Sequence, residues 1–231
     1  MAAKPGEMSV FFPCLNEAEN LPALVEETAK VLEEIADDYE IIIVDDGSTD
    51  STSHVCQSLA TRFTQLRVVT HAQNRGYGAA LRSGFQAASK ELVFYTDGDH
   101  QFDLRELRHL LPLLEDADIV SAYRQNRRDP WFRKLNAGIY NLALKLLFGL
   151  RVRDVDCAFK LYRRQIFDHI AIQADGAFVD AEILIKAKRL GYRIAQIGVT
   201  HRPRLRGRPT GAKLRVILRA VGEMIRMRIA G

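Results

Sequence analysis

Cysteine is scarce in this sequence, and long apolar stretches are absent. The three cysteines, Cys14, Cys56 and Cys157, form no CxxC pair, which argues against a disulfide framework and against a cysteine-rich zinc site. No run approaches the roughly 20 apolar residues of a membrane-spanning helix. The N-terminal sequence MAAKPGEMSVFFP lacks a positive region followed by an apolar run, so we expect no signal peptide. We therefore expect free thiols in the cytoplasm and a chain that is soluble or lies on a membrane surface.

The composition is that of a folded domain, but the charge is unevenly distributed. Of the 231 residues, 47% are hydrophobic and 27% are charged, a balance that can bury a sizeable core. The length suits one α/β domain, alone or with a small appendage. The net charge is +4, yet residues 201–231 hold nine Lys or Arg against one acidic residue, Glu223. No aromatic stacking array accompanies this basic tail, so we expect no nucleic-acid partner.

Short apolar runs alternate with segments of helical periodicity along most of the chain. Strands are predicted at residues 8–12, 41–44, 66–70, 92–95 and 119–122. Helices are predicted at residues 21–36, 51–63, 78–89 and 104–114. This alternation predicts an α/β fold in which helices cover both faces of a mostly parallel sheet. Two further segments, 136–150 and the basic amphipathic 212–231, either contact a membrane or pack against the domain.

Polar residues that directly follow apolar strands mark the candidate site. In an open parallel sheet, ligands bind beyond the carboxyl ends of the strands. Four segments occupy such positions: Pro13 to Glu17, Asp45 to Thr49, Asn74 to Gly78 and Asp97 to Gln101. We therefore expect these segments to gather at one edge of the sheet.

The segment after the fourth strand holds two carboxylates separated by one glycine. Asp97 and Asp99 flank Gly98, an arrangement that lets a hard divalent cation bridge the protein and a diphosphate. A turn stabilised by the Asp side chains is the competing explanation for an isolated DGD. Its position directly after VFYT favours the metal site.

The other segments have both functional and structural interpretations. The carboxylates of Asp45 and Asp46 can accept hydrogen bonds from a base or ribose, while the residues after them can cap the next helix. Arg75, in a glycine-containing turn, can place a guanidinium near phosphates, or the turn is an ordinary loop. Asp180 and Glu182 form an acidic pair that a helix N-terminus would also favour.

Four ordered motifs carry a family resemblance: FPCLNEAENL, IIIVDDGSTDST, NRGYGAALRSGF and VFYTDGDHQFD. With SAYR, VRDVDCAFKLYRR and GAFVDAEILIKAKRLGYRI further along, they resemble family 2 glycosyltransferases of the polyprenyl-phosphate (dolichyl-phosphate) mannose and glucose synthase group. The resemblance covers nearly the whole chain. It departs at Cys14, where many relatives have a bulkier residue, and at Ala158, which replaces a common glycine.

The resemblance implies a GT-A fold, a Rossmann-like nucleotide-sugar-binding architecture. It implies a catalytic domain over residues 1–206, with an acceptor-side segment over about 124–206. A basic lid and an amphipathic helix would follow at 207–231. The implied nucleotide-sugar contacts are Pro13, Asn16, Glu17, Asp45, Asp46, Arg75, Asp97 and Gly98. The implied metal contacts for Mg²⁺ or Mn²⁺ are Asp97, Asp99 and Gln101.

The resemblance also implies the catalytic groups and the acceptor. The implied catalytic residues are Asp97, Asp99, Arg124, Asp180, Glu182 and Arg206. Of these, Asp97 and Asp99 would contact the metal and the diphosphate, and Asp180 and Glu182 would face the sugar. Arg124, Arg202, Arg204 and Arg206 would contact phosphates, and Arg206 would close over the reacting groups. His201 is either a further ligand or a structural histidine.

The reaction so implied is an inverting, metal-dependent transfer of a hexose from GDP-mannose or UDP-glucose to a polyprenyl phosphate. An anionic phosphate acceptor needs no strong base, whereas a hydroxyl acceptor would need one such as Asp180. A sugar or lipid hydroxyl as acceptor is the alternative, and a nucleotidyltransferase is a remote one. Because a polyprenyl tail is insoluble, we expect peripheral attachment to the cytoplasmic face of a membrane.

Overall fold

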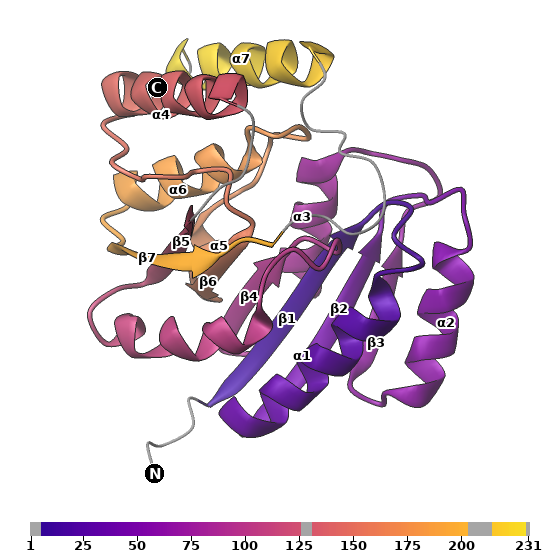
Figure 1. Cartoon of the computed structure of the whole chain (residues 1–231). Coiled ribbons are helices and arrows are strands. Elements are labelled where there is room, and N and C mark those ends of the chain that lie inside the picture. The colour runs from indigo at the N-terminus through magenta and orange to yellow at the C-terminus, as the bar shows by residue number, and fades with distance from the viewer. Residues whose placement is uncertain (1–5, 126–130, 203–213, 230–231) are drawn as a thin grey trace.

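The structure is a computed structural model that describes residues 6–125, 131–202 and 214–229. Its centre is a seven-stranded sheet in the order β3-β2-β1-β4-β6-β5-β7 (Figure 1). The strands are β1 (Glu7–Cys14), β2 (Asp38–Asp45), β3 (Leu66–Thr70), β4 (Leu92–Thr96), β5 (Ile119–Gln125), β6 (Phe159–Arg163) and β7 (Ile194–Thr200). Every neighbouring pair is parallel except the two that involve β6, which runs antiparallel to β4 and β5. The predicted mostly parallel sheet is therefore confirmed.

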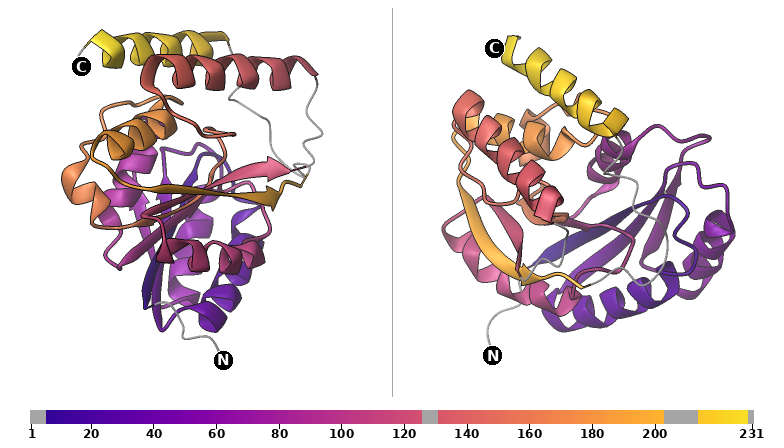
Figure 2. Two further views of the ribbon diagram at one scale, coloured as in Figure 1. Left: turned by 90° about the vertical axis from the view of Figure 1, so that its left-hand side faces the viewer. Right: turned by 45° about the horizontal axis from the view of Figure 1, so that its top comes forward.

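Helices cover both faces of this sheet, as the alternating pattern predicts. They are α1 (Leu21–Ile35), α2 (Thr52–Arg62), α3 (Tyr77–Ala87), α4 (Trp131–Phe148), α5 (Ile166–His169), α6 (Val179–Arg189) and α7 (Leu214–Ile229). Helix α1 contacts α2, and α3 contacts α6 across the other face (Figures 1 and 2). The strand β1 is buried along almost its whole length because it is covered on both sides.

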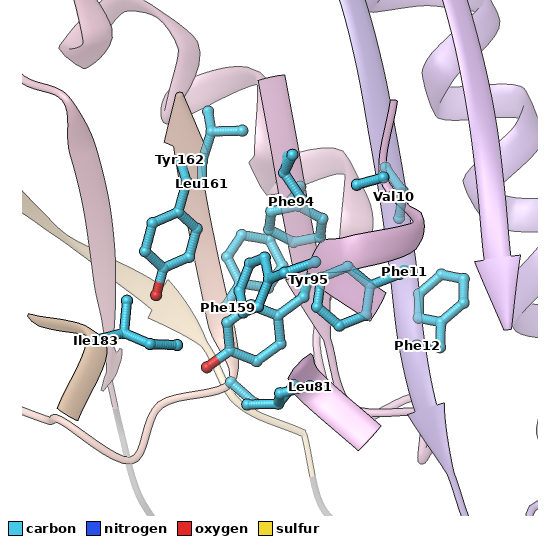
Figure 3. Close-up of a cluster of buried hydrophobic side chains, with 14 of the residues drawn as sticks. Val10, Phe11, Phe12, Leu81, Phe94, Tyr95, Phe159, Leu161, Tyr162 and Ile183 are labelled. Atoms are coloured by element: carbon cyan, nitrogen blue, oxygen red, sulfur yellow. The ribbon is translucent and has the colours of Figure 1, made fainter. Parts of the chain in front are cut away.

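Aromatic rings fill the core between the sheet and α3 (Figure 3). The ring of Phe11 stacks on Tyr95 with centroids 5.4 Å apart and meets Phe85 edge-on at 4.8 Å. Gly84 of α3 allows this approach, since a Cβ there would lie 2.3 Å from the Phe11 ring. The core thus anchors β1 and β4, the two strands that carry the candidate site at their carboxyl ends.

The helix predicted over Leu104 to Leu114 is wrong in type. The segment forms two 3₁₀ helices, η1 (Leu104–His109) and η2 (Leu111–Glu115). Pro112 explains the break, because it has no amide hydrogen and its ring clashes with the carbonyl four residues earlier in an α-helix. In the observed structure Pro112 lies in the first turn of the second 3₁₀ helix, where its missing amide hydrogen costs no hydrogen bond.

Helices α4 and α7 lie side by side at one end of the molecule (Figures 1 and 2). Each has an inner face that is buried, with Leu144 on α4 and Met224 on α7. Each also exposes large aliphatic side chains: Ile139, Leu142, Leu146 and Leu147 on α4, and Ile225 and Ile229 on α7. Neither these helices nor any other in the described part of the chain is long and apolar enough to cross a bilayer.

Candidate active site

The loop after β1 is tied to the loop after β2. Asn16 adopts the left-handed backbone conformation at φ 57°. Its side-chain oxygen accepts a hydrogen bond from the Thr49 amide at 2.8 Å, and its own amide donates to Ser48 Oγ at 2.9 Å. The Glu17 amide donates to Thr52 Oγ1 at 2.9 Å. Asn16 and Glu17 therefore reach the sheet edge where they are predicted, with roles that fix the loops to each other.

The carboxylates after β2 also organise loops. Asp45 accepts from the Ser48 amide at 3.0 Å. Asp46 accepts from the amides of Arg75 and Gly76, each at 2.9 Å, which draws the third loop towards the second. The side chain of Arg75 is exposed, and the hydrogen bond from its backbone amide to Asp46 holds it at the edge of the site. Both Asp side chains are buried and satisfied within the protein.

Asp97 lies directly beyond β4. Tyr77, the first residue of α3, donates its hydroxyl to Asp97 Oδ1 at 3.0 Å. Burial, and then the nearby charge of Asp99, raise the pKa of Asp97 to about 7. Gly98 is required here, because a Cβ would lie 2.5 Å from Cys14 Sγ. The close approach brings the loop after β4 against the end of β1.

The chemistry of these side chains fits a hard divalent cation. Two crowded carboxylates repel each other, and a cation between them and a diphosphate would relieve that repulsion. Gln101 uses its amide nitrogen to hold the Arg202 carbonyl at 2.9 Å, which leaves its own oxygen for other contacts. Within the described ranges, no group of three His, Cys, Asp or Glu assembles a complete metal cage. Phosphate oxygens and water would therefore have to complete the shell, as is common for Mg²⁺.

Asp180, at the start of α6, is brought to the same site. It accepts a hydrogen bond from Lys160 Nζ at 2.6 Å and another from the Tyr95 hydroxyl. Lys160 is fully buried and also donates to the Cys157 carbonyl at 2.6 Å. Lys160 was not among the predicted site residues, although a lysine in the centre of the apolar strand FKLYR was a visible signal.

Glu182, the second acid of the predicted pair, has different partners from Asp180. Its carboxylate accepts from the backbone amides of Gln173 and Ala174, at 3.0 and 2.7 Å, and from Lys186 Nζ at 2.6 Å. Residues two apart on a helix point in different directions, which is why the two acids have separate partners. Glu182 fixes the loop before α6.

Arg124 and Arg202 are held in ion pairs. Arg124, a predicted phosphate contact, forms two parallel hydrogen bonds to Asp154, at 2.7 and 2.8 Å. Arg202 donates to Asp103 at 2.7 Å, beside the bridge between Phe102 and His201. The predicted phosphate contacts Arg204 and Arg206 lie outside the described residues.

One further acidic residue of the site was not predicted. Asp156 belongs to the segment VRDVDCAFKLYRR, but nothing in its spacing distinguished it from Asp154. It is exposed to solvent and forms no hydrogen bond or ion pair with any residue the structure describes. Its electrostatic neighbours include Asp180, Lys160 and Arg124, which places it near the residues of the site.

Comparisons with known proteins agree with this geometry. A family model described as Glycosyl transferase family 2 matches residues 9–171. The chain is 35% identical over 168 residues to an undecaprenyl-phosphate 4-deoxy-4-formamido-L-arabinose transferase of Proteus mirabilis (strain HI4320), a match that covers 71% of the chain and 51% of that relative. The corresponding transferase of Serratia proteamaculans (strain 568) is 36% identical over 165 residues, covering 70% and 50%. The chain thus spans about half the length of the curated relatives it matches.

Solved structures show the same fold. Glucosyl-3-phosphoglycerate synthase from Mycobacterium tuberculosis, crystallised with Mn²⁺ and UDP-glucose, has a TM-score of 0.73 at 24% identity. The match covers 96% of this chain and 78% of that one. A complex of the same synthase with Mn²⁺, UDP-glucose and phosphoglyceric acid matches with a TM-score of 0.71 at 26% identity, covering 94% and 79%. The GT-A fold expected from the sequence motifs is confirmed.

Proposed function

This chain belongs to glycosyl transferase family 2, and we propose that it transfers a hexose from a nucleoside diphosphate sugar to a polyprenyl phosphate. The observation that carries the proposal is the convergence of Asp97, Asp180 and the loops after β1 and β2 at one edge of the sheet. The names of the relatives from Proteus and Serratia support a polyprenyl phosphate acceptor. The UDP-glucose in the solved neighbour supports a nucleoside diphosphate donor.

In this proposal, Asp97 and Asp99 hold Mg²⁺ or Mn²⁺ against the donor diphosphate, with Gln101 beside them. The cation, when bound, would supply charge stabilisation for the departing nucleoside diphosphate. Mn²⁺ and Mg²⁺ are present in complexes of the solved neighbour. The loops tied by Asn16 and Asp46 would form the wall for the nucleoside. Arg204 and Arg206 stay predicted phosphate contacts.

The acceptor proposed here is a phosphate rather than a hydroxyl. Asp180, the candidate base for a hydroxyl acceptor, accepts from both Lys160 and Tyr95 through its Oδ1. A phosphate acceptor is already an anion near neutral pH and attacks without such a base. Inversion at the anomeric carbon would follow from a single displacement by that phosphate.

A transfer assay tests this proposal. Radiolabelled sugar from UDP-glucose or GDP-mannose, offered separately, is expected to enter a short polyprenyl phosphate when Mg²⁺ or Mn²⁺ is present. Product would be measured by extraction into organic solvent, with EDTA as the metal-free arm. Transfer to a soluble hydroxyl compound such as phosphoglyceric acid, with none to the lipid, would contradict the lipid acceptor while leaving the family assignment intact.

We propose that α4 and α7 attach the protein to the cytoplasmic face of a membrane. Ile139, Leu142 and Leu146 follow the spacing of one helical stripe and are more than half exposed. The exposed cations Lys145, Arg226 and Arg228 lie on the same two helices. An aliphatic surface with cations beside it matches an anionic bilayer. The division into a catalytic domain (1–206) and a C-terminal segment (207–231) stays part of this proposal.

Leu146→Glu is expected to weaken binding to anionic liposomes about tenfold or more, because it replaces a leucine worth roughly 2 kcal/mol when buried. Sedimentation with phosphatidylglycerol vesicles at low salt would measure the change. Leu190→Glu is the matched control, since Leu190 is 55% exposed but belongs to neither helix. Equal weakening by both variants, or wild-type binding that is absent at low salt, would contradict attachment through α4 and α7.

A further inference from the structure

Tyr77, the first residue of α3, lies between two residues whose backbones are tied to other parts of the chain. The Gly76 amide donates to Asp46 Oδ2 at 2.9 Å, in the loop after β2. The Gly78 amide donates to the carbonyl oxygen of Asp175, also at 2.9 Å, in the segment before α6. Because both neighbours are held, the backbone of Tyr77 is fixed on either side and its side chain can leave the chain in only one direction.

Glycine is required on both sides of Tyr77. A Cβ on Gly76 would lie 2.6 Å from the carbonyl oxygen of Asp175, and a Cβ on Gly78 would lie 2.3 Å from that of Ala174. Gly76 also has φ 101°, a conformation that other residues rarely adopt. The loop can therefore pack this closely against the segment before α6 only with glycine at these two positions.

A buried chain of hydrogen bonds holds the loop from the side of Asp46. The carboxylate of Asp46 accepts from the amides of Arg75 and Gly76, each at 2.9 Å. His71 Nδ1 lies 2.6 Å from Asp46 Oδ1 and donates to it, because a carboxylate only accepts. His71 Nε2 lies 2.9 Å from Ser83 Oγ on α3. The side chains of His71 and Asp46 are only 5% and 6% exposed, so water competes little for these bonds. The orientation of Asp46, and with it the position of the loop, therefore depends on His71.

The Tyr77 hydroxyl acts on one of the candidate metal contacts. It donates to Asp97 Oδ1 at 3.0 Å, directly beyond β4. A carboxylate held at one oxygen presents its other oxygen in a defined direction. Carboxylates that bind metals are commonly held in this way by a second residue, and loss of that residue typically lowers metal affinity about 10- to 100-fold. Tyr77 has the position and the donor for such a role.

We propose that Tyr77 is a positioning residue that orients Asp97 for the divalent cation, and that His71 acts on the same cation through Asp46 and Tyr77. This inference rests on the proposed function, because the cation belongs to the donor site. A merely structural role for the two residues would change the stability of the fold and leave the affinity for the cation unaltered. Metal affinity is therefore the quantity to measure.

The electron paramagnetic resonance signal of free Mn²⁺, recorded during titration with saturating UDP present, gives that affinity. Tyr77→Phe keeps the ring and removes only the hydroxyl, and it is expected to weaken Mn²⁺ binding about 10- to 100-fold. Tyr162→Phe is the matched control, because the Tyr162 hydroxyl is buried and has no hydrogen-bond partner in the part of the chain that the structure describes. The control should bind Mn²⁺ within about twofold of the wild type. Equal affinities for the two variants would overturn the role of Tyr77.

A double variant tests whether His71 acts through Tyr77. His71→Leu removes both hydrogen bonds of the ring and is expected to weaken Mn²⁺ binding about 10-fold in the wild-type background. In the Tyr77→Phe background it should add less than about twofold, since the hydroxyl through which it acts is already gone. Losses that simply add would overturn the action of His71 through Tyr77.

Two further measurements separate the remaining outcomes. His71→Asn keeps a side-chain donor that can reach Asp46, so it is expected to bind Mn²⁺ more tightly than His71→Leu and supplies a second variant if the leucine prevents folding. Equal or weaker binding by His71→Asn would overturn the role of the hydrogen bond to Asp46. A wild type that binds Mn²⁺ no more tightly with UDP than without it would instead contradict the proposed cation between Asp97, Asp99 and the diphosphate, and with it the proposed function.

Discussion

Asp97→Asn is expected to lower kcat for sugar transfer about 1000-fold, while the protein unfolds at an equal or higher temperature. The activity falls because one of the two carboxylates that would hold the cation and diphosphate is lost, and such electrostatic contacts contribute about 100- to 1000-fold each. The fold is retained because the amide fills the same space and can still accept from the Tyr77 hydroxyl. Its stability does not fall because the substitution removes a partly buried charge that Asp99 repels.

An assay of sugar transfer would test the expected loss of activity. The unfolding temperature of the same preparation, measured without added metal, would test the expected stability. The matched control is Asp168→Asn, which neutralises an exposed acid on α5. A large fall in unfolding temperature together with lost activity would assign Asp97 a structural role. Activity within tenfold of wild type would contradict its contact with the cation and diphosphate.

Lys160→Met is expected to destabilise the fold by about 3–5 kcal/mol, the cost of leaving one member of a buried ion pair without its partner. Lys160 is fully buried, and the Asp180 side chain is 4% exposed. Methionine matches the length of the aliphatic stem but supplies no charge, so the Asp180 carboxylate would keep only the Tyr95 hydroxyl. Urea unfolding at neutral pH would measure the loss.

A double variant identifies the cause. Lys160→Met with Asp180→Leu removes both charges and should recover most of the lost stability, because a well-packed apolar pair often replaces a buried ion pair without cost. Lys186→Met is the control, since Glu182 would keep its two backbone donors after losing Lys186. If the double variant were less stable than Lys160→Met alone, the unpaired charge would not explain the destabilisation.

The sheet edge could be predicted because it depends on local patterns. Each apolar run marks a strand, and the polar residues after it must lie at the carboxyl end. This rule alone predicts that Asn16, Asp45 and Asp97 lie at one edge of the sheet, where the folded chain has them. It could not assign the partners of Asp45 and Asp46, since a carboxylate that binds a nucleotide and one that binds a loop amide have the same sequence signature.

Contacts that depend on β6 could not be predicted in the same way. This strand lies antiparallel between β4 and β5. In the sequence, the regular alternation of apolar runs and helical segments has already become loose before this strand begins. Its register pairs Tyr95 with Lys160, which in turn sets Lys160 against Asp180, 20 residues further on. The ion pair between Arg124 and Asp154 has the same origin, because β5 and the chain entering β6 become neighbours only in the folded sheet.

Helix α4 has different neighbours on its two sides. Tyr140 and Leu144 face the protein, while Ile139, Leu142 and Leu146 face outward. Outward positions can exchange one aliphatic residue for another during evolution with little consequence for the chemistry inside. A single inserted residue before Ile139 would have a different effect, because it rotates every following side chain by about 100° around the helix axis. Ile139 would then take the position that Tyr140 has now, and Leu144 would turn towards the exposed position of Lys145, so this helix should tolerate substitutions but resist changes in length.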